Sequence, residues 1–319
     1  MANTGTAQVT QAVTEFFNKR LLMKAQPYLP HNKWADIADL PRNSGTLIRR
    51  RRYTLLTSAT TPIVEGVTPD LQALAITNVD TTVQEYGSGV LLTRKLLYTT
   101  LDPLLNEVND LLAQNSGNTL DQLNRDELAT TTTKQYASTA TSTATVTSAM
   151  KLTKDEIMQA VRTLKNNNAM KITSMVDSSD GFNSSPIPAA FIGLVHPSSS
   201  YDLKNISGFV RVEEYGSQKA AMENEIGTLD EVRFIESTNA KVRTAEGAGS
   251  IDVYSTIILA KEAYMNSRIA GEGLRNIIEG PGGNSDPFHQ RTTSVWFATF
   301  ATNILNDNFL VDIQHAVSA

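Results

Sequence analysis

The side chains best suited to acid–base or metal chemistry, the histidines, are scattered through this 319-residue sequence. They are His31, His196, His289 and His315. No two stand three or four residues apart, so no helix can present a pair of them to one metal ion. Cysteine is absent, which excludes disulfides, thiolate metal sites and cysteine nucleophiles. His196 follows an apolar segment, where a catalytic base could stand, but we favour a capping or hydrogen-bonded turn histidine.

Loops that bind phosphate groups are also missing. The sequence contains no Gly-Lys pair, so a Walker loop cannot form. Gly271-Glu272-Gly273 lacks the third glycine and the preceding strand of a dinucleotide-binding turn. There is no Gly-x-Ser-x-Gly elbow, and no pair of carboxylates stands out for acid–base work. We therefore predict no catalytic residue, no cofactor and no metal site, and we expect a protein that is not an enzyme.

The most unusual charged feature is a run of four arginines. They are Arg49, Arg50, Arg51 and Arg52, in a segment whose composition favours a strand. Alternate residues of a strand point to opposite faces, so two guanidinium groups would face each way. A nucleic-acid patch would need interleaved aromatic side chains, and only Tyr53 is nearby. We predict contacts with carboxylates of a neighbouring subunit rather than nucleic-acid binding, with plain solvation as a further alternative.

Composition sets broad limits. A chain with 40% hydrophobic residues can bury one large core or two modest ones. The net charge of −5 gives no overall sign of nucleic-acid binding. No apolar run approaches the roughly 20 residues needed to span a bilayer. Residues 1–11 are polar and do not resemble a secretion signal, so we expect a soluble protein of a reducing cytoplasm.

The elements that would position the arginines begin with an arm and a ribbon. The first 45 residues resemble an extended arm, with a short amphipathic helix over residues 10–23. Residues 46–56, 71–84 and 89–97 favour extended strands, around a loop tip at 57–70. A two-stranded ribbon is only marginally stable by itself in water. This ribbon therefore needs a supporting surface, and none within its own length is evident.

Two helices have clear signals. Asp102 and Pro103 suit a helix start, and leucines recur on one helical face as far as Leu128. A helix over residues 102–129 would be roughly 40 Å long, with a weak point at 115–118. Thr153 and Glu156 have the spacing of a capping box, which predicts a second helix that ends at 166–168.

The remaining segments alternate in type. The Thr-rich residues 129–149 predict a strand with loops, residues 197–204 a helix, and 271–284 a glycine-rich stretch. Further strands are expected at 189–195, 232–235, 253–260, 292–305 and 309–313. This order predicts an α+β fold with interleaved subdomains.

Several short stretches carry a resemblance to a known family. They are Glu65-Gly66-Val67-Thr68-Pro69, Gln84-Glu85-Tyr86-Gly87, residues 163–169, Val195-His196-Pro197, Tyr201-Asp202-Leu203, Asn224-Glu225-Ile226-Gly227, residues 232–238, and Asp286-Pro287 followed by Gln290-Arg291 and Trp296. In this order, from about residue 20 to the C-terminus, the chain resembles major capsid proteins of tailed bacteriophages. These proteins have the Hong Kong 97-type fold, and the resemblance is to the podophage-like branch.

The resemblance implies a division of the chain. Its parts are an N-arm at 1–45, an E-loop at 46–97, a P domain with a long spine helix at 98–149, an A domain at 150–265, a return to the P domain at 266–307, and a C-terminal strand at the A domain over 308–319. In that family the arm and E-loop reach over adjacent subunits, so a neighbour would support the ribbon. We expect the subunit contacts to involve the four arginines together with Glu65 and the exposed spine-helix carboxylates Glu107 and Asp110.

The resemblance also implies a function. Subunits would form hexamers and pentamers of an icosahedral head, assembled in the host bacterial cytoplasm, that encloses double-stranded DNA without sequence-specific binding. Implied partners are a separate scaffolding protein, a portal and, optionally, a cement protein. The founding member of the fold links subunits through a ribbon lysine, but here no lysine lies between Lys33 and Lys95, which predicts a non-covalent shell. An encapsulin-like nanocompartment shell and a cytosolic enzyme with an unrecognised site remain as alternatives.

Overall fold

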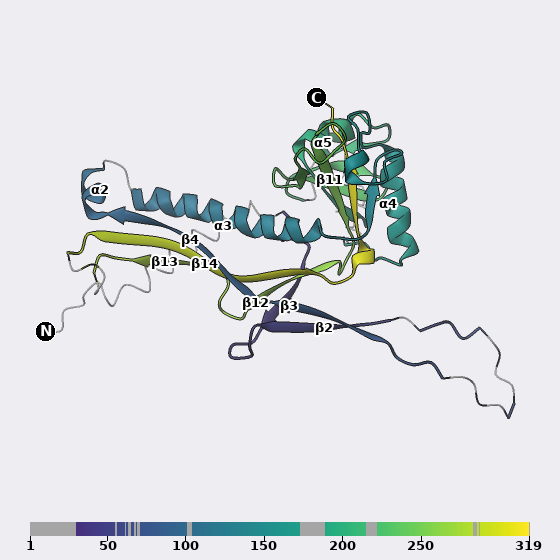
Figure 1. Cartoon of the computed structure of the whole chain (residues 1–319), viewed down its shortest axis with the longest axis horizontal. Helices are drawn as coiled ribbons and strands as arrows, with labels where there is room; N and C mark the ends of the chain where they lie inside the picture. The colour runs from purple at the N-terminus through teal and green to yellow at the C-terminus, as the bar shows by residue number, and fades with distance from the viewer. Residues whose placement is uncertain are drawn as a thin grey trace, which may run out of the picture.

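The structure is a computed structural model, and it describes residues 30–318 except 55, 61, 63–64, 67, 69–70, 101–103, 173–188, 215–221, 283–285 and 287. The helix expected at 10–23 and the helix start expected at Asp102 and Pro103 lie outside the described residues. The described chain is elongated (Figure 1). A layer of one helix and one sheet extends to one side, a β ribbon extends to the other, and a second domain lies above.

The first part, which we call the spine layer, is the helix α3 (Leu104–Leu128) packed on a five-stranded sheet. The strands are β1 (Asp36–Leu40), β12 (Tyr264–Ile269), β14 (Arg291–Ile304), β13 (Arg275–Glu279) and β4 (Gln84–Thr93). β14 is the central strand of this sheet. β12 pairs with one part of β14 and β13 with another, and β4 pairs with ten residues of β14. The short helix α2 (Arg94–Thr99) follows β4 at the far end of the layer (Figure 1).

The predicted weak point in α3 does not break the helix, which runs for 25 residues or about 38 Å. Ser116 and Gly117 are buried, and their small size lets the helix approach the sheet closely. Asn115 accepts a hydrogen bond from the indole Nε1 of Trp296 at 2.8 Å. Tertiary packing therefore compensates for the low helix propensity of this stretch.

The second part, which we call the eight-stranded domain, contains the other large sheet. Its strands are, in spatial order, β5 (Lys134–Tyr136), β15 (Leu310–His315), β11 (Val253–Leu259), β6 (Phe191–Val195), β9 (Val232–Glu236), β8 (Glu225–Leu229) and β7 (Val210–Arg211), with β10 (Val242–Arg243) paired to β11. Its helices are α4 (Lys154–Asn166), α5 (Pro197–Lys204) and the 3-10 turns η3 (Thr143–Thr145), η4 (Val212–Glu214) and η5 (Asp307–Phe309).

The core of this domain lies between α4 and the sheet. Ile157 and Leu164 of α4 pack with Phe191 and Phe234 of the strands, and all four side chains are almost fully buried. The predicted capping box is confirmed, because Thr153 and Glu156 bond reciprocally at the start of α4. Local rules and packing therefore agree on where this helix begins.

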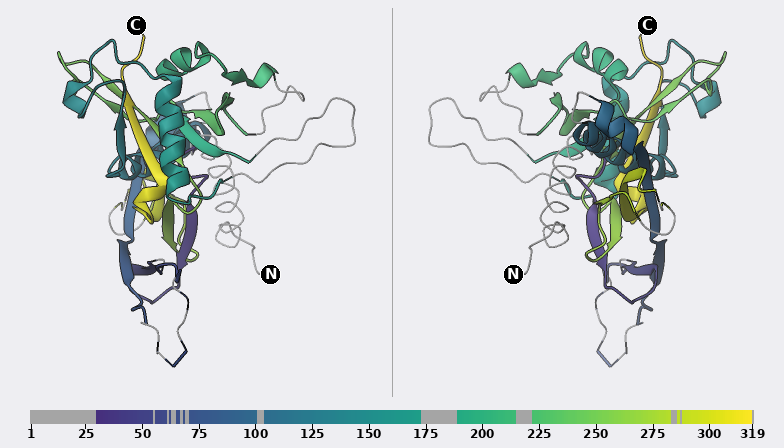
Figure 2. Two further views of the ribbon diagram at one scale, coloured as in Figure 1. Left: turned by 90° about the vertical axis from the view of Figure 1, so that its right-hand side faces the viewer. Right: turned by 90° about the vertical axis from the view of Figure 1, so that its left-hand side faces the viewer.

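The ribbon consists of β2 (Leu47–Tyr53) and β3 (Ile76–Thr82), paired antiparallel from Leu47 opposite Thr82 to Tyr53 opposite Ile76. They form a two-stranded sheet of their own. The ribbon projects away from the rest of the molecule, as two further views show (Figure 2). The expected ribbon is confirmed in this part of the chain.

The strand expected at 89–97 was wrong in its last part, because residues 94–97 belong to the helix α2, which Thr93 caps. The strand with loops expected at 129–149 is confirmed, since β5 lies there among turns, together with η3. The glycine-rich stretch 271–284 also contains the strand β13, which pairs with β14.

Not every apolar side chain of the two helices is buried. Leu111 of α3 is 63% exposed and Met158 of α4 is 44% exposed. Each lies off the side of its helix that carries the buried residues.

Candidate subunit-contact surfaces

At its base, the ribbon is fixed to its own subunit by its arginines. On one face Arg49 binds Asp80, which lies directly opposite in the β2–β3 register, through two bonds of 2.7 Å. Hydrogen bonding from this guanidinium lowers the pKa of the Asp80 carboxyl. Both side chains are exposed to solvent, so the pair orients the strands more than it stabilises them.

The opposite face of β2 contacts the spine layer. Arg50 binds Asp36 of β1 at 2.5 Å, and Arg52 donates to the side-chain oxygen of Asn306 at 2.9 Å. Arg51 is exposed and has no hydrogen bond or ion pair to any described residue. The expected alternation of the four side chains between two faces is therefore present, and three of them use partners within the chain.

Beyond its base, the ribbon exposes large apolar side chains. Leu71 is 90% exposed, Leu74 is 60% exposed and Leu56 is 59% exposed. Tyr53 and Ile76, where the paired strands end, are about half exposed. We call this part, residues 53–76, the distal ribbon. Exposed apolar side chains gathered on one projecting element indicate a surface that another molecule covers.

The expectation that the ribbon finds no support in its own chain holds only for this distal part. The returning strand β4 belongs to the spine-layer sheet, where it pairs with β14 from Gln84 to Thr93. Leu92 is buried against α3 and Trp296. The sequence analysis missed this pairing because the two strands lie about 200 residues apart in the sequence.

The other expected contact residues lie at separate places. Glu65 is exposed in the turn at the ribbon tip, and Glu107 is exposed in the first turn of α3. Asp110 was expected to be exposed, but it is partly buried and has an interaction within the chain. The structure therefore does not bring Glu65, Glu107 and Asp110 together with the arginines within one subunit.

The histidines have structural roles where the structure shows their partners. His196 caps α5, and its Nδ1 accepts a hydrogen bond from the backbone N–H of Ser198 at 3.1 Å, as the sequence analysis favoured. Partial burial lowers its pKa. His31 is fully buried against Asp121 of α3. His315 is also fully buried, and burial lowers its pKa to about 4.

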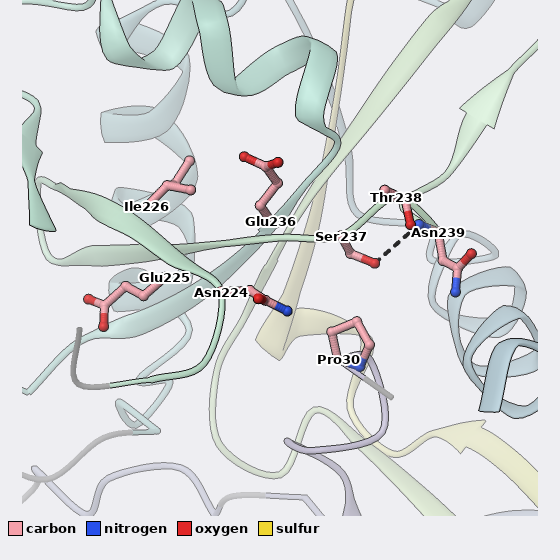
Figure 3. A pocket seen from close by; sticks show the side chains of 8 residues that line it. All are labelled: Pro30, Asn224, Glu225, Ile226, Glu236, Ser237, Thr238 and Asn239. Atoms are coloured by element: carbon pink, nitrogen blue, oxygen red, sulfur yellow. Dashed lines mark hydrogen bonds between the residues drawn. The ribbon is translucent and has the colours of Figure 1, made fainter. Parts of the chain in front are cut away.

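Two parts of the most distinctive sequence motif, residues 224–226 and 236–238, line a surface hollow of about 390 Å³ (Figure 3). Its two carboxylates, Glu225 and Glu236, point in different directions. Glu225 is paired with Arg233 at 3.7 Å. The hydrogen bond drawn in Figure 3 joins Ser237 to Asn239. This arrangement does not pair a nucleophile with a base.

Two searches of the described residues were negative. They contain no group of three or more His, Asp or Glu side chains that could hold a metal ion. No described helix has the length and apolar character needed to cross a membrane.

The fold is similar to that of known proteins, although the sequence is not. No protein-family model and no curated protein matches the sequence. Among solved structures, the capsid of Ralstonia phage GP4 matches with a TM-score of 0.68 and 12% identity, over 89% of this chain and 87% of that one. The capsid of cyanophage Pam1 matches with a TM-score of 0.63 and 13% identity, over 93% and 92%. The SrpI encapsulin of Synechococcus elongatus PCC 7942 matches with a TM-score of 0.55 and 9% identity, over 89% and 86%.

Each of these likenesses covers more than four-fifths of both chains. The chain therefore has the α+β architecture of tailed-phage capsid proteins, the Hong Kong 97-type fold. This confirms the fold class that the sequence motifs implied.

Proposed function

We propose that this chain is the major capsid protein of a tailed bacteriophage, a structural subunit and not an enzyme. The observation that carries the proposal is the distal ribbon, whose exposed leucines have no partner among the described residues of the same chain. The match to phage capsids over about nine-tenths of both chains supports it. Subunits would assemble into hexamers and pentamers of an icosahedral head around double-stranded DNA.

The domain names follow from this proposal. The eight-stranded domain would be the A domain at 150–265, joined by the C-terminal strand 308–319, and the spine layer the P domain at 98–149 and 266–307. Because β5 and η3 belong to the eight-stranded domain, the A domain would also include the residues from about 130 to 149. Residues 1–45 would be the N-arm and 46–97 the E-loop. Because β4 is part of the spine-layer sheet, the reaching part of the E-loop would be the shorter segment 46–83.

The same proposal names the partners. A separate scaffolding protein, a portal and, in some shells, a cement protein would join the homo-oligomer. The subunit would assemble in the host bacterial cytoplasm and remain in the virion. DNA would be enclosed without sequence-specific contacts, which agrees with the net charge of −5.

An encapsulin-like shell is the second candidate, because the SrpI encapsulin has the same fold. Phage structures make up most of the matches compared, with TM-scores from 0.53 to 0.68, and this favours the phage assignment over the encapsulin, at 0.55. The content of purified particles distinguishes the two. Nuclease-resistant DNA of uniform length supports the capsid, whereas protein cargo without DNA supports the nanocompartment. A stable monomer in light scattering would favour the third candidate, a cytosolic enzyme.

Charge reversal at Arg51 is expected to reduce particle yield about tenfold without changing the thermal stability of the subunit. Arg51 is exposed and unpaired among described residues, so its charge is available to a neighbour. Loss of an attractive contact and gain of a repulsive one cost about 1–2 kcal/mol together. Arg51→Glu and the charge-conserving Arg51→Lys should be compared by sedimentation of assembled particles. Equal yields would reject a contact role for Arg51.

Arg50→Glu is expected to reduce the yield by a different route. It replaces the bond to Asp36 with a repulsion, so the base of the ribbon should also loosen in the free subunit. Faster proteolysis within residues 46–83 would report this loosening.

The shell is expected to be non-covalent. The ribbon carries no lysine, because none lies between Lys33 and Lys95, so it cannot donate an amine to an isopeptide bond. Mature particles boiled in detergent should give a single band of about 34.8 kDa in denaturing electrophoresis. A ladder of linked subunits that survives boiling would contradict this prediction.

A further inference from the structure

The segment from the end of β14 to the start of η5, residues 303–307, touches three separate parts of the molecule. We call it the joint loop. Its first contact is with the base of the ribbon. The side-chain nitrogen of Asn303 donates to the backbone oxygen of Asp80 at 3.0 Å and to the hydroxyl of Thr81 at 3.1 Å. The guanidinium of Arg52 donates to Asn306 at 2.9 Å. The joint loop therefore holds both strands of the ribbon.

Its second contact is with the chain that leaves the end of α3 for the eight-stranded domain. The carboxylate of Asp307 accepts the hydroxyl of Thr131 at 2.5 Å and the backbone N–H of Thr132 at 3.1 Å. It also accepts the hydroxyl of Thr132, and the backbone oxygen of Asp307 accepts the hydroxyl of Thr133 at 2.9 Å. Asp307 thus binds three consecutive residues of this connection, two through its carboxylate and one through its backbone oxygen.

Its third contact is with the connection between β11 and β12. The backbone N–H groups of Leu305 and Asn306 both donate to the oxygen of Ala263, at 2.9 and 3.1 Å. Residues 129–133, 260–263 and 305–309 are the described segments that pass between the two domains. All of them meet at the joint loop.

Little packed side-chain material lies between the ribbon and the end of the spine. A surface hollow of about 310 Å³ separates Arg52, Thr77 and Val79 of the ribbon from Glu127 and the adjoining threonines at the end of α3. The joint loop forms the rest of its wall. The joint loop is therefore a direct polar link between the ribbon base and the domain connection.

We propose that the joint loop couples the position of the ribbon to the orientation of the eight-stranded domain relative to the spine layer. The ribbon contacts at Asn303 and Asn306 and the domain contact at Asp307 lie within five consecutive residues, so the loop cannot shift at Asn306 without moving the adjacent Asp307. The polar contacts are individually weak and partly open to water, so they can exchange partners without unfolding a core. Coupling between sites is reciprocal, so each end should respond to a change at the other.

The coupling is a property of the free subunit and does not depend on the proposed function. Its use does rest on that function, since a neighbour that holds the distal ribbon in a shell would bias the tilt between the two domains. The test is therefore made on the full-length chain before assembly, where a failure of the coupling leaves the capsid assignment untouched.

Hydrogen exchange of backbone amides tests the proposal. Arg52→Gln should speed exchange about fivefold at Thr132 and Asp312, which donate to Asp307 and Thr133 across the joint. Arg51→Gln is the matched control, because it removes the neighbouring charge on the other face of β2, and exchange at these amides should not change. Circular dichroism at the same temperature verifies that each variant is folded.

The reciprocal variant is Asp307→Asn. It should speed exchange about fivefold at Val83, whose N–H donates to Thr46 at the ribbon base. In the double variant Arg52→Gln with Asp307→Asn, the fold-change should be clearly smaller than the product of the single changes, because the second substitution breaks a link already broken. Effects confined to residues 46–53 and 76–83 for Arg52→Gln would overturn the proposal. A fully multiplicative double variant, or an equal effect from Arg51→Gln, would overturn it too. If Asp307→Asn does not fold, the Arg52 variants decide alone.

Discussion

Aspartate in place of both Leu71 and Leu74 is expected to abolish particle formation while the subunit remains folded. Both side chains are exposed in the free subunit, so their loss removes no contact from its core. Burial of a leucine side chain by a neighbour contributes about 2 kcal/mol, so two of them contribute about 4 kcal/mol to each contact. Each subunit contact should therefore weaken at least about 100-fold. A closed shell repeats this contact at every subunit.

The measurement compares particle yield by sedimentation with the thermal unfolding midpoint of unassembled protein. Thr60→Asp is the matched control, since it adds a negative charge to the same exposed segment without removing an apolar side chain. Wild-type yield from the double leucine variant would show that the distal ribbon is not a contact surface. An equal loss from Thr60→Asp would assign the effect to charge instead of apolar burial.

Trp296→Ala is expected to destabilise the subunit by about 3–5 kcal/mol. Trp296 is 1% exposed, belongs to the central strand β14 and packs with Val108 and Leu112 of α3. The substitution leaves a large cavity between the spine helix and its sheet. It also removes the bond from the indole to Asn115. Particle yield should fall with stability, because the spine layer carries both β4 and the base of the ribbon.

Urea unfolding of the unassembled subunit measures the effect. Trp296→Phe serves as the control, since it keeps most of the apolar volume and should cost only about 1–2 kcal/mol. A midpoint for Trp296→Ala within the error of the wild type would mean that α3 and the sheet are not held together by this side chain.

The elements that local rules determine were predictable from the sequence. The capping box located the start of α4, and the leucine spacing located α3. β1 was missed because two of its five residues are aspartates, which are depleted in strands. It is a strand because it pairs in parallel with β12, more than 220 residues later. Pairing of this kind leaves no local signal.

The candidate contact surface was only partly predictable. The alternation of the four arginines follows from strand geometry alone, and the structure has it. Their partners do not follow from the sequence, because Asp36 and Asn306 come from distant segments that the fold brings to the base of the ribbon. Of the three partners, only Asp80 could have been predicted from the sequence, because pairing β2 with β3 places it opposite Arg49.

The partners of the arginines within the subunit change where the contacts between subunits are expected. The arginine run was expected to bind a neighbour, and three of its members bind within the subunit instead. The exposed leucines of the distal ribbon, which lie in the segments predicted as strands on either side of the loop tip, are the stronger candidates. In this proposal polar contacts set the direction of the ribbon, and apolar contacts hold it to the next subunit.

Electron microscopy of the full-length chain, expressed with and without its scaffolding protein, tests the central proposal most directly. A shell subunit with an uncovered distal ribbon should give closed icosahedral particles or rings of five and six subunits, and particles of uniform size when the scaffolding protein is present. Discrete monomers under every assembly condition, at protein concentrations where capsid subunits associate, would contradict the proposal that this chain builds a shell.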